Sequence, residues 1–294
     1  MSGKLKEVRE RMKSVRSTQQ ITNAMKMVSA AKLRRAQDAI TQMRPYSAKL
    51  NQMLKNILAN ADSSANTSFG TVREVRKALV IVVTSSRGLC GAFNTNVIKA
   101  AVQNIETHYA DIRREGNLSI MCIGKKGADF FRRNYKDCQI IRDHEQLFMD
   151  LSFQNTSKVA QLVMDGFSET HYDAVDVVYS VFKNPATQFA TTTHYLPVQI
   201  EQTKTKARAD YIFEPDQDTL LEQLIPSILQ TQFQGFLLDT HASEHGARMT
   251  AMDKATENAE ELLKELRINY NKARQEAITK ELSEIVGGAA ALEG

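Results

Sequence analysis

Hydrophobic residues recur with helical spacing over two long stretches, one at each end of the chain. The first runs from about Lys4 to Asn60 and the last from about Gln217 to Val286. Both exceed the usual length of globular helices, and about 45 helical residues would extend roughly 70 Å. Neither helix can bury its apolar stripe alone. We therefore expect the chain ends to pair as an antiparallel coiled coil, a shaft that carries a globular head. A homodimeric coiled coil is the alternative.

The last stretch carries a seam in which apolar or small residues alternate at spacings of three and four. Its members are Met249, Met252, Thr256, Ala259, Leu263, Leu266, Tyr270, Ala273 and Ala277. This heptad spacing indicates a coiled coil, and the shortage of Leu and Ile predicts close but weakly specified packing. After Ala277 the phase shifts to Ile278, Leu282 and Ile285, as a stutter would produce.

The first stretch begins with the same spacing, in Leu5, Val8, Met12 and Val15. Polar residues then occupy positions 17–20. We expect the apolar set to resume out of phase at Ile21, Met25 and Val28, so that the seam drifts around the helix. Pro45 is expected to kink the helix or end a turn.

Between these stretches the pattern changes to short, β-branched strands that alternate with helices. Strands are predicted at residues 78–84, 118–123, 139–141, 174–182 and 189–200, and helices at about 94–109, 125–134 and 156–169. This alternation predicts a mostly parallel, doubly wound, Rossmann-like α/β head. The expected division is a shaft helix over 1–60, a linker over 61–76, the head over 77–210 and a second shaft helix over 211–294.

Composition narrows the class of protein. The chain is 24% charged and 42% hydrophobic, and it has no run of about 18 apolar residues that could span a bilayer. Its N-terminus lacks the apolar centre of a signal peptide. Three cysteines, an odd number without CxxC spacing, indicate reduced thiols in a cytosolic compartment and give no zinc site.

Charge is unevenly distributed along the chain. Residues 1–49 hold twelve Lys and Arg against three acidic residues, a net charge of +9, so the formal +4 of the whole leaves −5 on the rest. A basic helix of this kind either faces an acidic or phosphate-bearing neighbour or is a solvated surface.

Two segments resemble sites of chemistry but are weak candidates. The glycine loop Thr84–Asn94 follows a strand and opens a helix, yet it matches neither phosphate-binding pattern, so a tight structural turn is the expected role. His241–His245 reads HxxEH, an inverted zinc-protease pattern, but it begins a coiled-coil helix with no expected cleft. The six histidines form no convincing catalytic set. We predict no catalytic residue, no metal site and no cofactor.

Three segments together resemble the γ subunit of F-type ATP synthases, of the bacterial type. They are residues 14–37 (SVRSTQQITNAMKMVSAAKLRRAQ), 84–94 (TSSRGLCGAFN) and 243–292, which begins SEHGARMTAMDKATENAEELLKELRINYNKARQ. Their order and separation also resemble those of the family. One departure is Ser86, which stands where the family commonly has an acid.

The resemblance implies a central-stalk rotor that is not itself an enzyme. Its partners would be the α and β subunits of the catalytic hexamer, the ε subunit and the c-subunit ring, and proton flow would turn the shaft. Without a transit peptide, the implied location is the cytoplasmic face of the bacterial inner membrane, held there only through the complex. A coiled-coil nucleic-acid-binding or scaffold protein is the alternative, and a zinc hydrolase is a third, weaker one.

The resemblance also implies contact residues. Arg248, Arg274, Gln275 and Thr279 match positions that meet β-subunit loops, and Met25 and Lys26 match the place where the first helix meets an acidic segment of β. Tyr211, Phe213 and Glu214 match the region near ε and the c ring. The small, uncharged tail over 286–292 would be the tip of the shaft in an apolar bearing.

Overall fold

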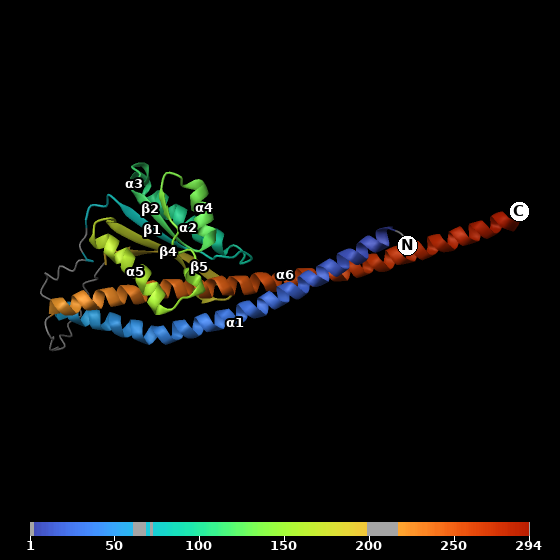
Figure 1. Ribbon diagram of the computed structural model, residues 1–294. Coiled ribbons are helices and arrows are strands. Elements are labelled where there is room, and N and C mark those ends of the chain that lie inside the picture. Colours follow the sequence, from blue (N-terminus) through green and yellow to red (C-terminus); the bar gives the residue numbers. More distant parts are fainter. Residues whose placement is uncertain (1–2, 61–68, 71–72, 199–216, 294) are drawn as a thin grey trace. The chain divides into compact units, whose positions relative to one another are not determined.

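The computed structural model describes residues 3–60, 69–70, 73–198 and 217–293 (Figure 1). They belong to two compact units. One comprises residues 1–29 together with 248–294, and the other comprises residues 30–247. Both long helices contribute residues to each unit.

The element order agrees with the predicted alternation. The helices are α1 (Gly3–Asn60), α2 (Phe93–His108), α3 (Ala110–Arg114), α4 (Lys125–Asn134), α5 (Phe153–Ser168) and α6 (Gln217–Glu293), with a short 3-10 turn, η1, at Leu147–Met149. The strands are β1 (Ala78–Val83), β2 (Leu118–Ile123), β3 (Gln139–Ile141), β4 (Ala174–Asn184) and β5 (Thr187–Leu196). Helix α1 continues through Pro45 rather than ending there.

The five strands form one sheet in the order β3-β2-β1-β4-β5. The first four strands are parallel, and β5 pairs antiparallel with β4 as an edge strand. Helices α2 and α4 connect the parallel neighbours β1 to β2 and β2 to β3, and α5 leads from β3 back to β4, which pairs with β1 (Figure 1). The doubly wound head is thereby confirmed, with one antiparallel strand added at its edge.

Both faces of the sheet are buried. Residues Ala78, Val80 and Val82 of β1 pack against α2 and α4. Their neighbours Leu79, Ile81 and Val83 face α5 and the first part of α6. A strand covered on both sides reads as a continuous apolar run, which is why ALVIVV has no polar alternation.

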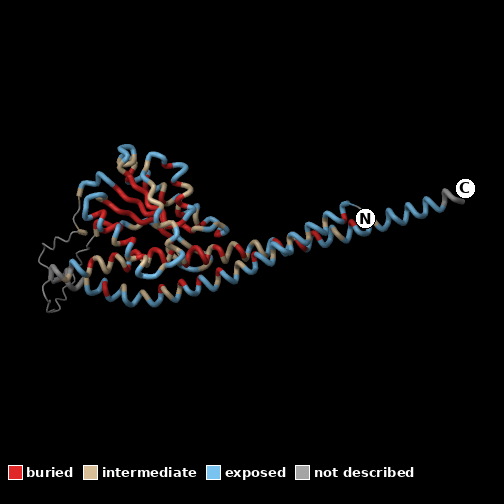
Figure 2. Tube along the Cα trace, in the orientation of Figure 1, coloured by how far each residue is buried: buried red, intermediate tan, exposed pale blue. Residues whose placement is uncertain are grey.

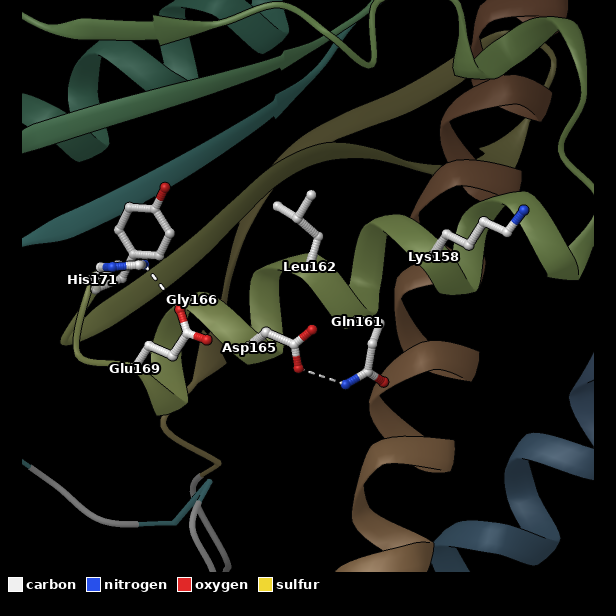
Figure 3. A pocket seen from close by; sticks show the side chains of 8 residues that line it. Lys158, Gln161, Leu162, Asp165, Gly166, Glu169 and His171 are labelled. Carbon is white, nitrogen blue, oxygen red and sulfur yellow. Dashed lines mark hydrogen bonds and ion pairs between the residues drawn. The ribbon is translucent and has the colours of Figure 1, made fainter.

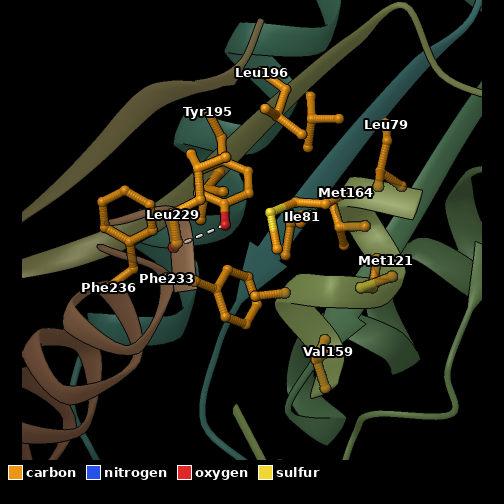
Figure 4. Close-up of a cluster of buried hydrophobic side chains, with 14 of the residues drawn as sticks. Leu79, Ile81, Met121, Val159, Met164, Tyr195, Leu196, Leu229, Phe233 and Phe236 are labelled. Carbon is orange, nitrogen blue, oxygen red and sulfur yellow. Dashed lines mark hydrogen bonds between the residues drawn. The ribbon is translucent and has the colours of Figure 1, made fainter. Parts of the chain in front are cut away.

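The first part of α6 is therefore a core helix of the head (Figure 4). The Phe233 side chain is fully buried, and the Phe236 ring lies 4.5 Å from the ring of Tyr179 on β4, centroid to centroid. The hydroxyl of Tyr195 on β5 donates to the Leu229 carbonyl at 2.9 Å. The predicted shaft helix thus begins as part of the head's own core.

The two long helices are antiparallel in the first unit. Lys4 pairs with Glu276, Arg9 donates to the Tyr270 hydroxyl, and Lys26 pairs with Asp253. Residue numbers fall on α6 as they rise on α1, and the predicted antiparallel pairing is confirmed. In the second unit, the Met43 side chain of α1 lies against Gly235 of α6.

The predicted seam of α6 is confirmed in the first unit. Its most buried members recur at spacings of three, four and seven, and they are Met252, Ala259, Leu263, Leu266 and Ala273. Two of these positions are the small residues Ala259 and Ala273, so the partner helix can approach closely there. This agrees with the close packing expected from a seam that is poor in Leu and Ile.

The predicted phase of α1 is wrong over residues 17–29. Ile21 and Val28 are each 57% exposed, whereas Thr22 and Ser29 are buried. The spacing that starts at Leu5 instead continues in phase through polar residues, and it reaches the buried Leu33, Ala36, Ile40 and Leu50.

Two hydroxyls explain how polar residues can occupy the α1 seam. The Thr22 hydroxyl is 2.7 Å from the hydroxyl of Thr256 on α6. The Ser29 hydroxyl donates to the Met25 carbonyl, also at 2.7 Å. A buried polar group that keeps a hydrogen bond avoids most of its desolvation cost. Hydropathy alone therefore assigned the wrong face of α1 in this segment.

The buried carboxylate of Asp176 links the sheet to α2 through hydrogen bonds. The side chain of Asp176 on β4 accepts hydrogen bonds from Asn104 at 2.9 Å and from His194 at 2.8 Å. Burial raises the pKa of Asp176, but the bonds from His194, Asn104 and Tyr109 together outweigh burial and leave the pKa below its ordinary value. The charged form therefore stabilises the fold.

We predict that Asp176→Asn will lower the free energy of unfolding by about 2 kcal/mol at pH 7, because a buried charged acceptor is lost. Since the pKa of Asp176 is lower in the folded state, its contribution is full above about pH 4 and declines as the pH falls through the folded pKa. Urea unfolding at several pH values tests this. The difference between wild type and variant should shrink in acid, and Asp143→Asn, at an exposed position, should show no such trend. A difference independent of pH would contradict the assignment.

Candidate functional site

An apolar stripe faces outward on α1 in the first unit. Ile21, Met25 and Val28 follow one another at spacings of four and three, which places them on one helix face. Ile21 and Val28 are exposed and Met25 is partly exposed. The exposed basic residues Lys32 and Arg35 continue the same spacing. We call Ile21, Met25 and Val28 the outward stripe. Its apolar centre beside basic residues suits a macromolecular partner with apolar and acidic side chains.

The two predicted contact residues of α1 differ in their surroundings. Met25 belongs to the outward stripe. Lys26 forms an ion pair with Asp253 of α6, and its side chain is 39% exposed. The ammonium group of Lys26 is thus already engaged within the chain.

The predicted contact residues of α6 fall into two environments. Arg274, Gln275 and Thr279 are exposed, beside the seam residue Ala273. Arg248 is only 7% exposed, so most of its side chain is covered by the chain itself. The structure therefore brings three of these four residues to one solvent-facing stretch of α6. Tyr211, Phe213 and Glu214 lie outside the described residues.

The last turns of α6 carry an exposed apolar surface. Every residue from Ile278 to Ala289 is exposed (Figure 2). Four large apolar side chains recur at helical spacing there, and they are Ile278, Leu282, Ile285 and Val286, between 47% and 66% exposed. Isolated helices of this kind are marginal in water, so such a surface is typical of a helix that a partner covers.

The glycine loop closes on itself and on α4. The Thr84 hydroxyl accepts from the Gly127 amide at 2.9 Å, and the Ser85 carbonyl accepts from the Lys126 amide at 3.1 Å. The Ser85 amide in turn donates to the Asn94 side chain at 3.0 Å. These bonds hold the loop against the start of α4 and the first turn of α2. They make this loop the structural turn that the sequence suggested.

Ser86 also has a structural contact. Its hydroxyl donates to the Glu145 carbonyl at 3.3 Å, which joins the glycine loop to the segment between β3 and α5. Sequence reasoning had no signal for this contact because the partner is a backbone group in a distant loop.

The HxxEH segment forms a histidine pair. The Nε2 atoms of His241 and His245 lie 3.1 Å apart, and the His241 ring stacks on Phe148 with centroids 5.9 Å apart. Within the described part of the chain, no cluster of three or more His, Cys, Asp or Glu side chains could hold a metal ion. The segment is a packed part of α6.

A hollow of about 420 Å³ lies along α5 (Figure 3). Its lining residues are Lys158, Gln161, Leu162, Asp165, Gly166, Glu169, His171 and Tyr172. Gln161 donates to Asp165 at 2.8 Å, and His171 lies 3.6 Å from Glu169. Both carboxylates of this lining thus have a neighbouring partner.

Sequence reasoning missed the residues that hold the helix pair together. Thr22 and Asp253 contact α6 and α1 respectively, yet neither stood out as a candidate. The available signal was the three–four spacing itself, which runs from Leu5 through Thr22 to Leu33 if polar residues are allowed in the seam.

No helix among the described residues combines the length and hydropathy needed to cross a membrane.

Comparisons with known proteins agree with the helix pair and head. A family model described as ATP synthase matches residues 4–292. The chain is 49% identical over 292 residues to the ATP synthase gamma chain of Cytophaga hutchinsonii, covering 98% of each. It is 50% identical over 291 residues to that of Flavobacterium psychrophilum, covering 99% of each. In solved structures it resembles a chain of the Euglena gracilis mitochondrial ATP synthase OSCP/F1/c-ring assembly, with a TM-score of 0.66 at 22% identity, covering 99% of this chain and 95% of that one. At that identity the likeness supports the fold.

The glycine loop yields a prediction on stability. Gly124 has φ of +99°, and a Cβ there would lie 2.0 Å from the Thr84 carbonyl oxygen. We expect Gly124→Ala to lower the free energy of unfolding by about 3 kcal/mol or more, since backbone must move. The matched control is Gly116→Ala, where φ is +76° with open space around the site, and we expect it to cost about 1 kcal/mol. Urea unfolding followed by circular dichroism measures both, and equal losses would refute the close approach.

Proposed function

The chain belongs to the ATP synthase family as one of its gamma chains, and on that premise we propose that its terminal helices turn as the central-stalk rotor of an F-type enzyme. The observation that carries this is the antiparallel pair of α1 and α6, which ends in an exposed apolar helix. The shaft would be residues 1–60 and 211–294, the head residues 77–210, and the linker residues 61–76. Proton-driven rotation of a c-subunit ring would turn both.

The chain's role is to bias the state of catalytic sites that other subunits supply. A ligand or subunit shifts an equilibrium only by its differential contacts with the two states. Helix α1 presents an apolar and basic surface, while the exposed end of α6 presents Arg274, Gln275 and Thr279. A rod with unlike sides, turning within three β subunits, would offer each a different set of contacts in turn.

The proposed contacts follow from this surface. Met25, in the outward stripe, would meet an acidic segment of β together with the exposed basic residues Lys32 and Arg35. Arg274, Gln275 and Thr279 would meet β loops. Arg248 is mostly covered, so we assign it to the same contact only through the edge that remains exposed. Tyr211, Phe213 and Glu214 would meet ε and the c ring.

The proposed location is the cytoplasmic face of the bacterial inner membrane. The chain would associate peripherally, through the complex, with α, β, ε and the c ring as partners. Support comes from its relatives, which are bacterial ATP synthase gamma chains matched along their full length. A nucleic-acid-binding coiled coil would instead show affinity for DNA that falls steeply with salt.

Complementation tests the proposed function. The chain should restore ATP synthesis by membrane vesicles of a strain that lacks its own gamma subunit, and it should copurify with α and β. The purified chain alone should not hydrolyse ATP. ATP hydrolysis by the isolated chain, or purification without α and β, would count against the rotor.

Arg274→Ala tests the proposed β contact. We expect it to lower ATP synthesis in reconstituted vesicles by about fivefold, as the loss of one charged interfacial contact would. Because Arg274 is exposed, the unfolding midpoint of the purified chain should change little. The matched control is Arg267→Ala, one heptad earlier on α6 and also exposed. Unchanged synthesis in Arg274→Ala would remove this residue from the interface.

A further inference from the structure

Polar residues occupy the middle of the α1 seam while apolar residues beside them face outward. Thr22 is buried and Lys26 is partly buried, and both contact α6 through Thr256 and Asp253. We call Thr22, Lys26, Asp253 and Thr256 the polar layer. The neighbouring outward stripe is exposed. Over this segment the hydrophobic pattern is therefore reversed relative to an ordinary coiled coil.

The reversed pattern gives α1 two competing faces. Each outward residue immediately precedes a seam residue, so Ile21, Met25 and Val28 lie about 100° around the helix from Thr22, Lys26 and Ser29. Turning α1 locally by that angle would bury the outward stripe against α6. Burial of apolar surface alone favours this turned setting. Within this segment, something other than the burial of its own apolar side chains must favour the observed setting.

We propose that the polar layer holds α1 in the rotational setting that keeps Ile21, Met25 and Val28 facing outward. The Thr22 and Thr256 hydroxyls are 2.7 Å apart, and Lys26 pairs with Asp253 one turn further along. Both interactions need the observed face of α1 toward α6. Polar groups in a coiled-coil seam select register in this way at some cost in stability.

Residues on either side of the segment support the same setting. The apolar seam residues Leu5 and Leu33 are buried in phase with Thr22. They fix the ends of the segment, and the polar layer keeps its middle in phase where apolar packing would not. The rotational setting of α1 does not depend on the proposed function. Its importance does, because the outward stripe is the surface that we assign to the contact with β. Lys26 is accordingly a positioning residue that acts through Asp253.

Charge reversal and its rescue test the proposal in the purified chain. Val28→Cys, in a background carrying Cys138→Ser, reports the rotational setting through its rate of maleimide labelling, since Cys90 and Cys122 are buried. Lys26→Asp faces Asp253 with a like charge, and we expect it to slow labelling about fivefold, the scale of one pairwise interaction. Lys26→Asp with Asp253→Lys should restore the rate. Lys13→Asp, the same change at an exposed position, is the control and should leave the rate unchanged.

The neutral variants Lys26→Gln and Asp253→Asn cover the case in which charge reversal lowers helix content. Each removes the ion pair without repulsion, and we expect labelling to slow about twofold, with no further slowing in the double variant. Unchanged labelling in every Lys26 variant would overturn the proposal. So would a charge-reversed double variant that stays as slow as Lys26→Asp.

ATP synthesis measured in reconstituted vesicles distinguishes a failure of this inference from a failure of the proposed rotor function. Lys26→Asp should lower ATP synthesis, and Lys26→Asp with Asp253→Lys should restore it. If synthesis stays low in the double variant, Lys26 acts directly on another subunit and the positioning role is wrong. If the wild-type chain fails to complement at all, the rotor function is wrong, and the labelling series still decides the role of the polar layer.

Discussion

The structure depends on one constraint, which is that each of two very long helices has only the other as a continuous apolar partner in the first unit. A seam at spacings of three and four satisfies it because this spacing keeps one stripe of each helix facing the other. Small residues such as Ala259 and Ala273 let the backbones approach closely. Among the described residues of this unit, most of the remaining surface of both helices is exposed.

The head meets its own constraint by a different route. Its sheet needs cover on both faces, and one face uses the start of α6 as well as α5. Phe233 and Phe236 thus serve the head, although they belong to the same helix as the seam residues. Helix α6 runs without interruption from these core residues of the head to the seam residues.

Local patterns predicted most of the fold. The bounds of β2 and β3 agree with the structure, since β-branched runs end at turns that the sequence marks clearly. The antiparallel direction of β5 did have a local signal, since only two residues separate β4 from β5 and parallel strands need a much longer crossover. The phase of α1 failed at Thr22 for a different reason. Whether a hydroxyl can be buried depends on a partner such as Thr256, 234 positions away.

The contact residues were less predictable than the fold. The exposure of Arg274 agrees with its proposed role, but the burial of Arg248 and the ion pair of Lys26 come from their neighbours in space. A helical motif fixes which residues share a face, but not which face the rest of the molecule covers.

The continuity of α6 also limits how the gene can change in length. Inserting or deleting one residue between Phe236 and Met252 would turn every later residue of the helix by about 100° relative to Phe236 and the residues before it. A change of seven residues, matched by seven in α1, would nearly preserve the phase of both the core side chains and the seam. Differences in length among such chains should therefore occur mainly in the loops of the head, while the two long helices keep a constant number of residues.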